Sequence, residues 1–192
     1  MLQNILLCGV GGQGILLAAK VIAAAASQSG FQVTTNEIHG MAQRGGSVTA
    51  FVRYGDSVFS PLFPPGQADV LASMEAAEAL RYAHWLRAGG LAAVSKQRLI
   101  PVTVSSGKAT YPADVDERLA RVFPVLKYLD CRQEALDLGD VRMANTVLLG
   151  ALSQGLDGIA ADVWEQALSR CVKPTFLDAN LRAFSLGRQS QN

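Results

Sequence analysis

The sequence predicts an α/β fold of three layers, with a mostly parallel sheet and a helical C-terminal part. Three observations predict this class: short apolar runs without alternation, a glycine-rich turn between the first run and a helix, and helical periodicity after Asp140. Because 192 residues suit one domain and no linker interrupts them, we expect a single domain over residues 1–192.

The composition indicates a folded cytoplasmic protein. Hydrophobic residues make up 49% of the chain and charged residues 17%, which allows a large core. A net charge of +1 without a long basic run argues against a nucleic-acid partner. The three cysteines are far apart, so we expect no metal site and a reducing compartment. The apolar stretch 15–26 contains Lys20 and is shorter than the about 20 residues of a membrane span.

The first part of the chain predicts a βαβ unit. Asn4–Cys8 has the apolar run of a buried strand, and Ile15–Ser29 is an Ala/Leu-rich helix that stops at a glycine. Gln32–Asn36 predicts the second strand. After a polar loop, Glu37–Gly46, the alternation in Ser47–Tyr54 predicts a strand with one polar face.

The rest of the chain predicts alternating strands and helices, followed by helices alone. Glycine or proline separates most of these segments. The predicted elements are a tight turn at Gly55–Asp56 with Val58–Phe59 returning as a strand, a proline-rich loop Pro61–Gln67, a strand Asp69–Ser73, a helix Met74–Leu86 ending near Gly89, strands Leu91–Val94 and Val125–Leu129, small edge pieces Pro101–Val104 and Thr110–Tyr111, and a helix Ala113–Arg121. The apolar helical faces that follow are Met143, Val147, Leu148, Ala151 and Leu152, then Val163, Trp164, Ala167, Leu168 and Cys171, then Leu177, Leu181 and Phe184.

The glycine turn has the GxGxxG spacing of dinucleotide-binding domains, through Gly9, Gly11 and Gly14. In that motif the glycines allow a tight turn, a close approach to phosphate and close packing of the helix on the sheet. Its position between a strand and a helix predicts a Rossmann-like sheet. A dinucleotide site also needs an acidic residue about 20 positions further on, for which Glu37 is a candidate; an ordinary surface carboxylate is the alternative.

The polar loop lies where open α/β sheets bind ligands, at the carboxyl edge. His39 can titrate near neutral pH, and Arg44 beside Gly45 and Gly46 could clamp a phosphate or carboxylate; a plain surface loop explains the same residues. We interpret His84, within a predicted helix, as structural. No nucleophile–base pair or acid cluster stands out, so we expect no catalytic residue and no metal ligand in this chain.

Three segments together resemble one family: Gly9–Gly14 (GVGGQG), Gly40–Val48 (GMAQRGGSV) and Asn145–Leu152 (NTVLLGAL). They are similar to the gamma subunits of pyruvate and other 2-oxoacid:ferredoxin oxidoreductases, and most of all to the small (beta) subunit of the indolepyruvate branch. The resemblance runs from about residue 4 to about residue 185. It implies a Rossmann-like, non-catalytic subunit, inactive alone, of an enzyme that decarboxylates a 2-oxoacid to an acyl-CoA and reduces ferredoxin.

The resemblance also implies a division of labour between subunits. Thiamine diphosphate, magnesium and 4Fe-4S clusters would belong to a large catalytic (alpha) subunit, and coenzyme A could reach the shared edge. The residues expected at this edge, facing a ligand or the partner, are Gly9, Gly11, Gly12, Gln13, Gly14, Gln43, Arg44, Gly45 and Gly46. Expressed alone, the chain could form a homodimer through an exposed apolar patch. The alternatives are an independent NAD(P)- or flavin-dependent oxidoreductase and a nucleotide-sensing module.

Overall fold

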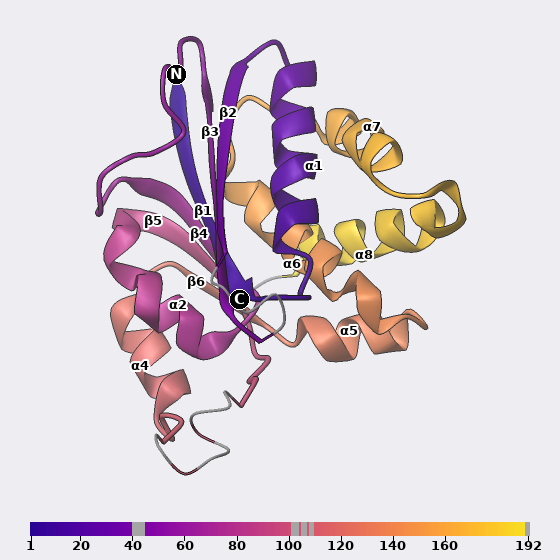
Figure 1. The fold of residues 1–192 in the computed structure, drawn as a ribbon. Helices are drawn as coiled ribbons and strands as arrows, with labels where there is room; N and C mark the ends of the chain where they lie inside the picture. The colour runs from indigo at the N-terminus through magenta and orange to yellow at the C-terminus, as the bar shows by residue number, and fades with distance from the viewer. Residues whose placement is uncertain (40–44, 101–103, 105–106, 108–109, 191–192) are drawn as a thin grey trace.

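The computed structural model describes residues 1–39, 45–100, 104, 107 and 110–190. Its strands form one six-stranded sheet with the order β2-β3-β1-β4-β5-β6 (Figure 1). The strands are β1 (Leu2–Val10), β2 (Gln32–His39), β3 (Ser47–Gly55), β4 (Ala68–Ser73), β5 (Leu86–Ser95) and β6 (Leu126–Leu129). β1, β4, β5 and β6 pair in parallel, and β3 is antiparallel to both of its neighbours, β1 and β2.

Helices cover both faces of the sheet, which confirms the predicted three-layer α/β class (Figure 1). The helices are α1 (Ile15–Gln28), α2 (Ala76–Tyr82), α4 (Val115–Val122), α5 (Cys131–Asp137), α6 (Ala144–Leu152), α7 (Ala161–Cys171) and α8 (Leu177–Gln189), with short 3-10 turns η1 (Ala83–Trp85), η2 (Val141–Met143), η3 (Ser153–Gly155) and η4 (Pro174–Phe176). α2 and α4 lie on one face, and α1 and α5 to α8 lie on the other. None of the described helices is long and apolar enough to cross a membrane.

The core alternates along β1, as a strand buried on both faces requires. Ile5 and Leu7 join the cluster under α1 and α6, whereas Leu6 and Cys8 join the cluster under α2 and α4. Burial of these apolar side chains, roughly 1.5–3 kcal/mol each for the larger ones, is the main stabilising term.

The predicted βαβ unit is present but split. β2 runs parallel to β1, as expected, yet β3 lies between them and β2 forms the edge of the sheet. β2 also continues to His39, so Glu37–His39 belong to the strand and not to the predicted loop. The predicted polar face of Ser47–Tyr54 was wrong: Thr49 and Phe51 are both buried, because β3 has a neighbour on each side and helices or loops on each face.

Two further predictions were wrong in position. The helix expected over Met74–Leu86 is shorter: α2 ends at Tyr82, and the 3-10 turn η1 follows it. The strand expected over Leu91–Val94 is longer: β5 already begins at Leu86 and contains Gly89. β5 pairs with β4 through an irregular register between Ala68 and Val70, which accommodates the glycines within a strand.

No strand forms at Val58–Phe59 or Thr110–Tyr111. The backbone N–H of Val58 donates to the side chain of Gln32 and not to a neighbouring strand, so the expected hairpin does not form. Of the other predicted edge piece, Pro101–Val104, residues 101–103 lie outside the described residues. Helix α5 was not predicted, whereas α4, β6 and the three C-terminal helical faces were placed correctly.

Candidate functional site

The glycine turn joins β1 to α1 at the carboxyl edge of the sheet, as predicted. Gly9 still belongs to β1, and the turn proper contains Gly11, Gly12, Gln13 and Gly14. The N–H of Gly11 donates to the carbonyl of Gly46 (2.9 Å), so the turn and the end of the polar loop are neighbours.

Gln13 is the centre of this turn. Its Oε1 accepts from the N–H of Val10 (2.7 Å), and its Nε2 donates to the carbonyl of Met74 (2.9 Å) and to Oε1 of Gln97 (3.0 Å). A Cβ at Gly9 would lie 2.8 Å from Oε1 of Gln13, so glycine makes room for this side chain. Gln13 therefore binds the ends of β1, β4 and β5 together, and its polar atoms point into the protein.

Gly14 allows a second close approach. Its φ is +80°, and a Cβ there would clash with the side chain of Asn145 at the start of α6. The amide of Asn145 donates to the carbonyl of Gly14 (3.3 Å). The first and third segments of the predicted resemblance, far apart in sequence, thus meet at this point.

The turn does not have the surroundings of a dinucleotide site. In such a site the acidic residue at the end of the second strand lies next to the turn. Here Glu37 pairs with Ala50 of β3, so it is two strands, roughly 10 Å, from β1. The N–H groups of Gly11 and Gln13 already have acceptors within the chain. Both facts disfavour the NAD(P) alternative.

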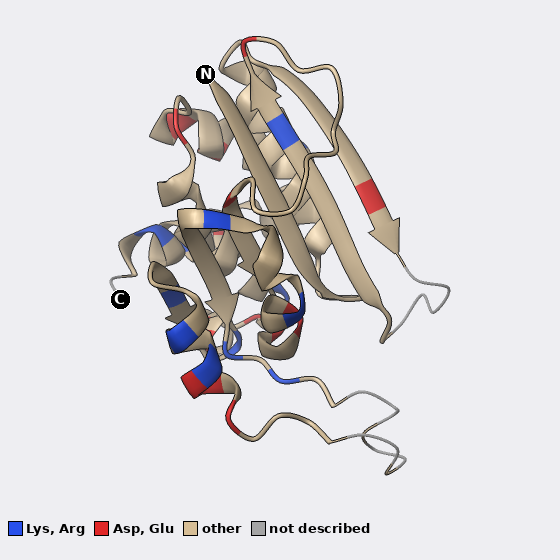
Figure 2. Cartoon of the chain, turned by 90° about the vertical axis from the view of Figure 1, so that its left-hand side faces the viewer, with Lys and Arg blue, Asp and Glu red and all other residues tan. Residues whose placement is uncertain are grey.

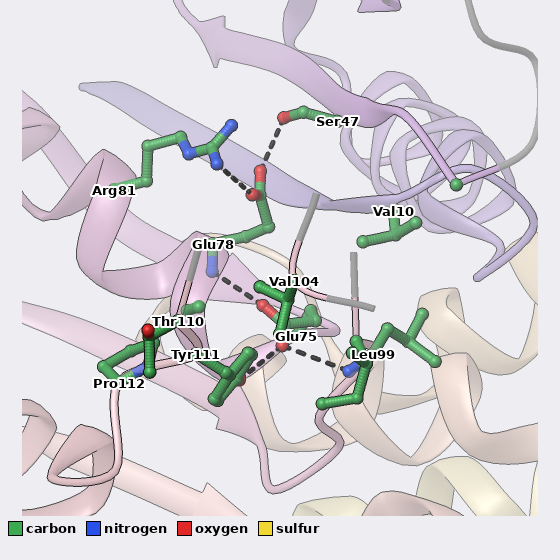
Figure 3. A pocket seen from close by; sticks show the side chains of 13 residues that line it. Val10, Ser47, Glu75, Glu78, Arg81, Leu99, Val104, Thr110, Tyr111 and Pro112 are labelled. Atoms are coloured by element: carbon green, nitrogen blue, oxygen red, sulfur yellow. Dashed lines mark hydrogen bonds and ion pairs between the residues drawn. The ribbon is translucent and has the colours of Figure 1, made fainter. Parts of the chain in front are cut away.

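A cavity of about 450 Å³ lies between the end of β1 and the start of α2 (Figure 3). Glu75, which is 2% exposed, accepts hydrogen bonds from the N–H of Glu78 (2.8 Å), the N–H of Leu99 (3.3 Å) and the hydroxyl of Tyr111 (2.6 Å). Burial and this contact with Glu75 raise the pKa of Tyr111. Glu75 was not predicted, and it caps α2 while holding the segment after β5.

Glu78 forms the other acidic wall of this cavity (Figure 3). Its carboxylate accepts from the hydroxyl of Ser47 (2.5 Å) and pairs with Arg81 (3.3 Å). Because both buried carboxylates are engaged by neighbouring donors, they fix the start of β3 and the segment after β5. The cavity is acidic and does not suit a phosphate.

Two more cavities flank the turn on its other sides. One, of about 530 Å³, is mostly apolar and contains Ile15, Leu16 and His39. The other, of about 410 Å³, has Arg132 and Arg142 in its wall, both unpredicted. Of the predicted edge residues, Gly45 and Gly46 directly precede β3, whereas Gln43 and Arg44 lie outside the described residues. His84 is exposed in η1, beside Trp85.

The described part of the chain has no set of side chains that could bind a metal ion. No group of three or more His, Cys, Asp or Glu side chains there could hold a metal ion. Cys8 and Cys131 are buried, and burial raises the pKa of each thiol to about 12, which opposes the thiolate that a cluster needs.

The family model for pyruvate ferredoxin/flavodoxin oxidoreductase matches residues 4–190. The chain belongs to this family. Indolepyruvate oxidoreductase subunit IorB from Pyrococcus horikoshii is 42% identical over 96% of this chain and 93% of its own length. The 2-oxoglutarate synthase subunit KorC from Methanothermobacter marburgensis is 28% identical, with 98% of this chain and 96% of its own covered.

The fold is also that of a family member of known structure. The keto/oxoacid ferredoxin oxidoreductase gamma subunit from Geobacter sulfurreducens matches with a TM-score of 0.71 and 25% identity, over 96% of this chain and 95% of that one. The predicted family resemblance is therefore confirmed, and this chain is homologous to small and gamma subunits of 2-oxoacid:ferredoxin oxidoreductases.

Proposed function

We propose that this chain is the small subunit of an indolepyruvate:ferredoxin oxidoreductase, in the cytoplasm, and is inactive alone. The identity of 42% along nearly the whole of an indolepyruvate oxidoreductase subunit carries this proposal, since the identity to a 2-oxoglutarate synthase subunit is only 28%. A large catalytic subunit would supply thiamine diphosphate, magnesium and the 4Fe-4S clusters, and would pass electrons to ferredoxin.

The carboxyl edge of the sheet is the face that we assign to the large subunit. The exposed apolar side chains at this edge are Leu16 (41%), at the start of α1 in the wall of the apolar cavity, and Ile38 (51%), near the end of β2 on the opposite face of the sheet. Apolar side chains that gather at an exposed edge are typical of interaction sites. Gln13 and Glu75 support this edge from inside by fixing the loops that form it.

Co-purification from cells that express both subunits tests the assignment. Leu16→Asp should abolish capture of the large subunit, because a buried unpaired charge is strongly unfavourable at an interface. Val122→Asp is the matched control, since Val122 is 46% exposed but lies on α4, away from this edge. Capture by both variants, or by neither, would contradict the assigned face.

Activity assays test the enzyme itself. Reduction of ferredoxin by indolepyruvate and coenzyme A should require both subunits. The Arg44→Ala complex should retain assembly with a raised KM for coenzyme A, if the polar loop contacts the coenzyme as the sequence suggests. Turnover by the isolated chain, or saturable binding of NAD(H) or FAD to it, would favour the independent oxidoreductase instead.

A further inference from the structure

The cavity beside Arg132 lies at the topological switch point of the sheet. The connection after β1 leads to α1 on one face, and the connection after β4 leads to α2 on the other. Open α/β sheets bind ligands in the crevice between two such strands. The cavity wall contains residues from the segments that follow β1, β4, β5 and β6, including Arg132 in the first turn of α5, together with the start of α6. Figure 1 shows α1, α5 and α6 converging at this end of the sheet.

The wall of this cavity is rich in hydrogen-bond donors. None of its residues is Asp or Glu, and two are arginines. In the part of the chain that the structure describes, no carboxylate lies within ion-pair distance of Arg132. Arg142 pairs with Asp140, and its guanidinium lies 4.5 Å from the centre of the Phe176 ring. Both contacts hold the guanidinium in place, and the carboxylate of Asp140 partly neutralises its charge. Among the described residues of this wall, Arg132 is therefore the arginine whose charge no carboxylate offsets.

The hydrogen bonds of Gln13 also decide how Gln97 is oriented. The N–H of Val10 needs the oxygen of Gln13, and the carbonyl of Met74 needs its nitrogen, so the amide of Gln13 has one orientation. That nitrogen also donates to Oε1 of Gln97 (3.0 Å). The NH2 group of Gln97, another residue of the wall, is consequently left as a donor, and no acceptor among the described residues takes it.

The glycine turn contributes backbone to the same wall. Gly12 belongs to this wall, and a Cβ there would meet no atom within 4 Å, so there is open space next to its backbone. We propose that this cavity, formed by Arg132, Arg142, Gln97 and the glycine turn, binds the phosphate groups of a small phosphate-bearing ligand. The proposal goes beyond the subunit role, because binding needs this chain alone.

Calorimetric titration of the full-length chain with inorganic pyrophosphate tests the proposal. We expect saturable binding that Arg132→Gln weakens about tenfold, as the loss of one charge-assisted contact predicts. Asp140→Asn should strengthen binding, because it removes the carboxylate that neutralises Arg142. Arg170→Gln, an exposed position on α7, is the matched control and should bind as the parent chain does.

A second titration identifies the source of the phosphate. Tighter binding of adenosine diphosphate than of pyrophosphate would assign a nucleotide, and equal binding would assign free phosphates; both outcomes support the site. The absence of saturable binding at millimolar pyrophosphate would overturn the proposal. Equal binding by Arg132→Gln and the parent chain would overturn it as well. Neither result bears on co-purification with a large subunit, so the two proposals fail separately.

Discussion

The contact between Gly14 and Asn145 predicts a measurable coupling between the glycine turn and helix α6. In Gly14→Ala the residue would keep a φ of +80°, which costs a non-glycine residue roughly 1–2 kcal/mol. The new Cβ would lie 2.9 Å from Cγ of Asn145 and 3.2 Å from its Cβ. Asn145 must then leave its rotamer, at about 0.5–1.5 kcal/mol, and lose its bond to Gly14, at about 0.5–1.5 kcal/mol.

We therefore expect Gly14→Ala to lower the free energy of unfolding by about 2–5 kcal/mol, measured by urea denaturation followed by circular dichroism. Asn145→Ala alone should cost about 1 kcal/mol, the value of one hydrogen bond. In the double variant the side chain that clashes is absent and the lost hydrogen bond counts only once, so its destabilisation should be smaller than the sum of the single ones by about 1–3 kcal/mol.

Gly12→Ala is the matched control for this cycle. Gly12 also has a positive φ (+97°), but a Cβ there meets no atom within 4 Å. Only the backbone strain, roughly 1–2 kcal/mol, should appear, and it should add to Asn145→Ala without coupling. Additive effects of Gly14→Ala and Asn145→Ala, within about 0.5 kcal/mol, would refute the contact as the reason for glycine at position 14.

Three other changes test the same structure. Gln13→Ala should lower the free energy of unfolding by about 1–3 kcal/mol, since it leaves the Val10 N–H and the Met74 carbonyl without partners; an unchanged urea midpoint would contradict this. Gly187→Ala should lower the Tm, because its Cβ would clash with the backbone of Val147 where α6 and α8 cross; a higher Tm would mean that helix propensity dominates. Burial raises the pKa of Cys8 from 9.0 to about 12, so its contribution to stability is complete below pH 9 and is lost as pH rises through 12. Cys8→Ala should make the urea midpoint fall less steeply between these pH values; an unchanged slope would assign alkaline destabilisation to other groups.

The layers and the glycine turn could be predicted because their signals are local. Asn4–Cys8 has an apolar run with no alternation, and such a run is typical of a strand buried on both faces. The turn after it has a fixed spacing, and α6 to α8 have regular apolar faces. Each signal requires only residues within one element, so the sequence was sufficient for them.

Strand order and the site's polar contacts could not be predicted, because they depend on residues far apart in sequence. Ser47–Gly55 gives no local sign that it lies between β1 and β2. Its alternation suggested a polar face, since Thr49 and Arg53 do not reveal that strands flank them on both sides. Likewise Gln13 and Gln97 are 84 positions apart, and only the fold brings their amides together.

The inserted strand gives the GxGxxG turn surroundings that differ from those in a dinucleotide-binding domain. In a dinucleotide-binding domain the second strand lies beside the first, so its terminal acid reaches a ligand on the turn. Here β3 occupies that place, and the carbonyl of Gly46 accepts the N–H of Gly11 that would otherwise approach a ligand. The glycines instead admit protein groups: the amide of Gln13 at Gly9 and the side chain of Asn145 at Gly14. The spacing of the motif is thus explained by packing, and the cavity that we propose for a phosphate ligand lies on the side of the same turn that faces Arg132 and Arg142.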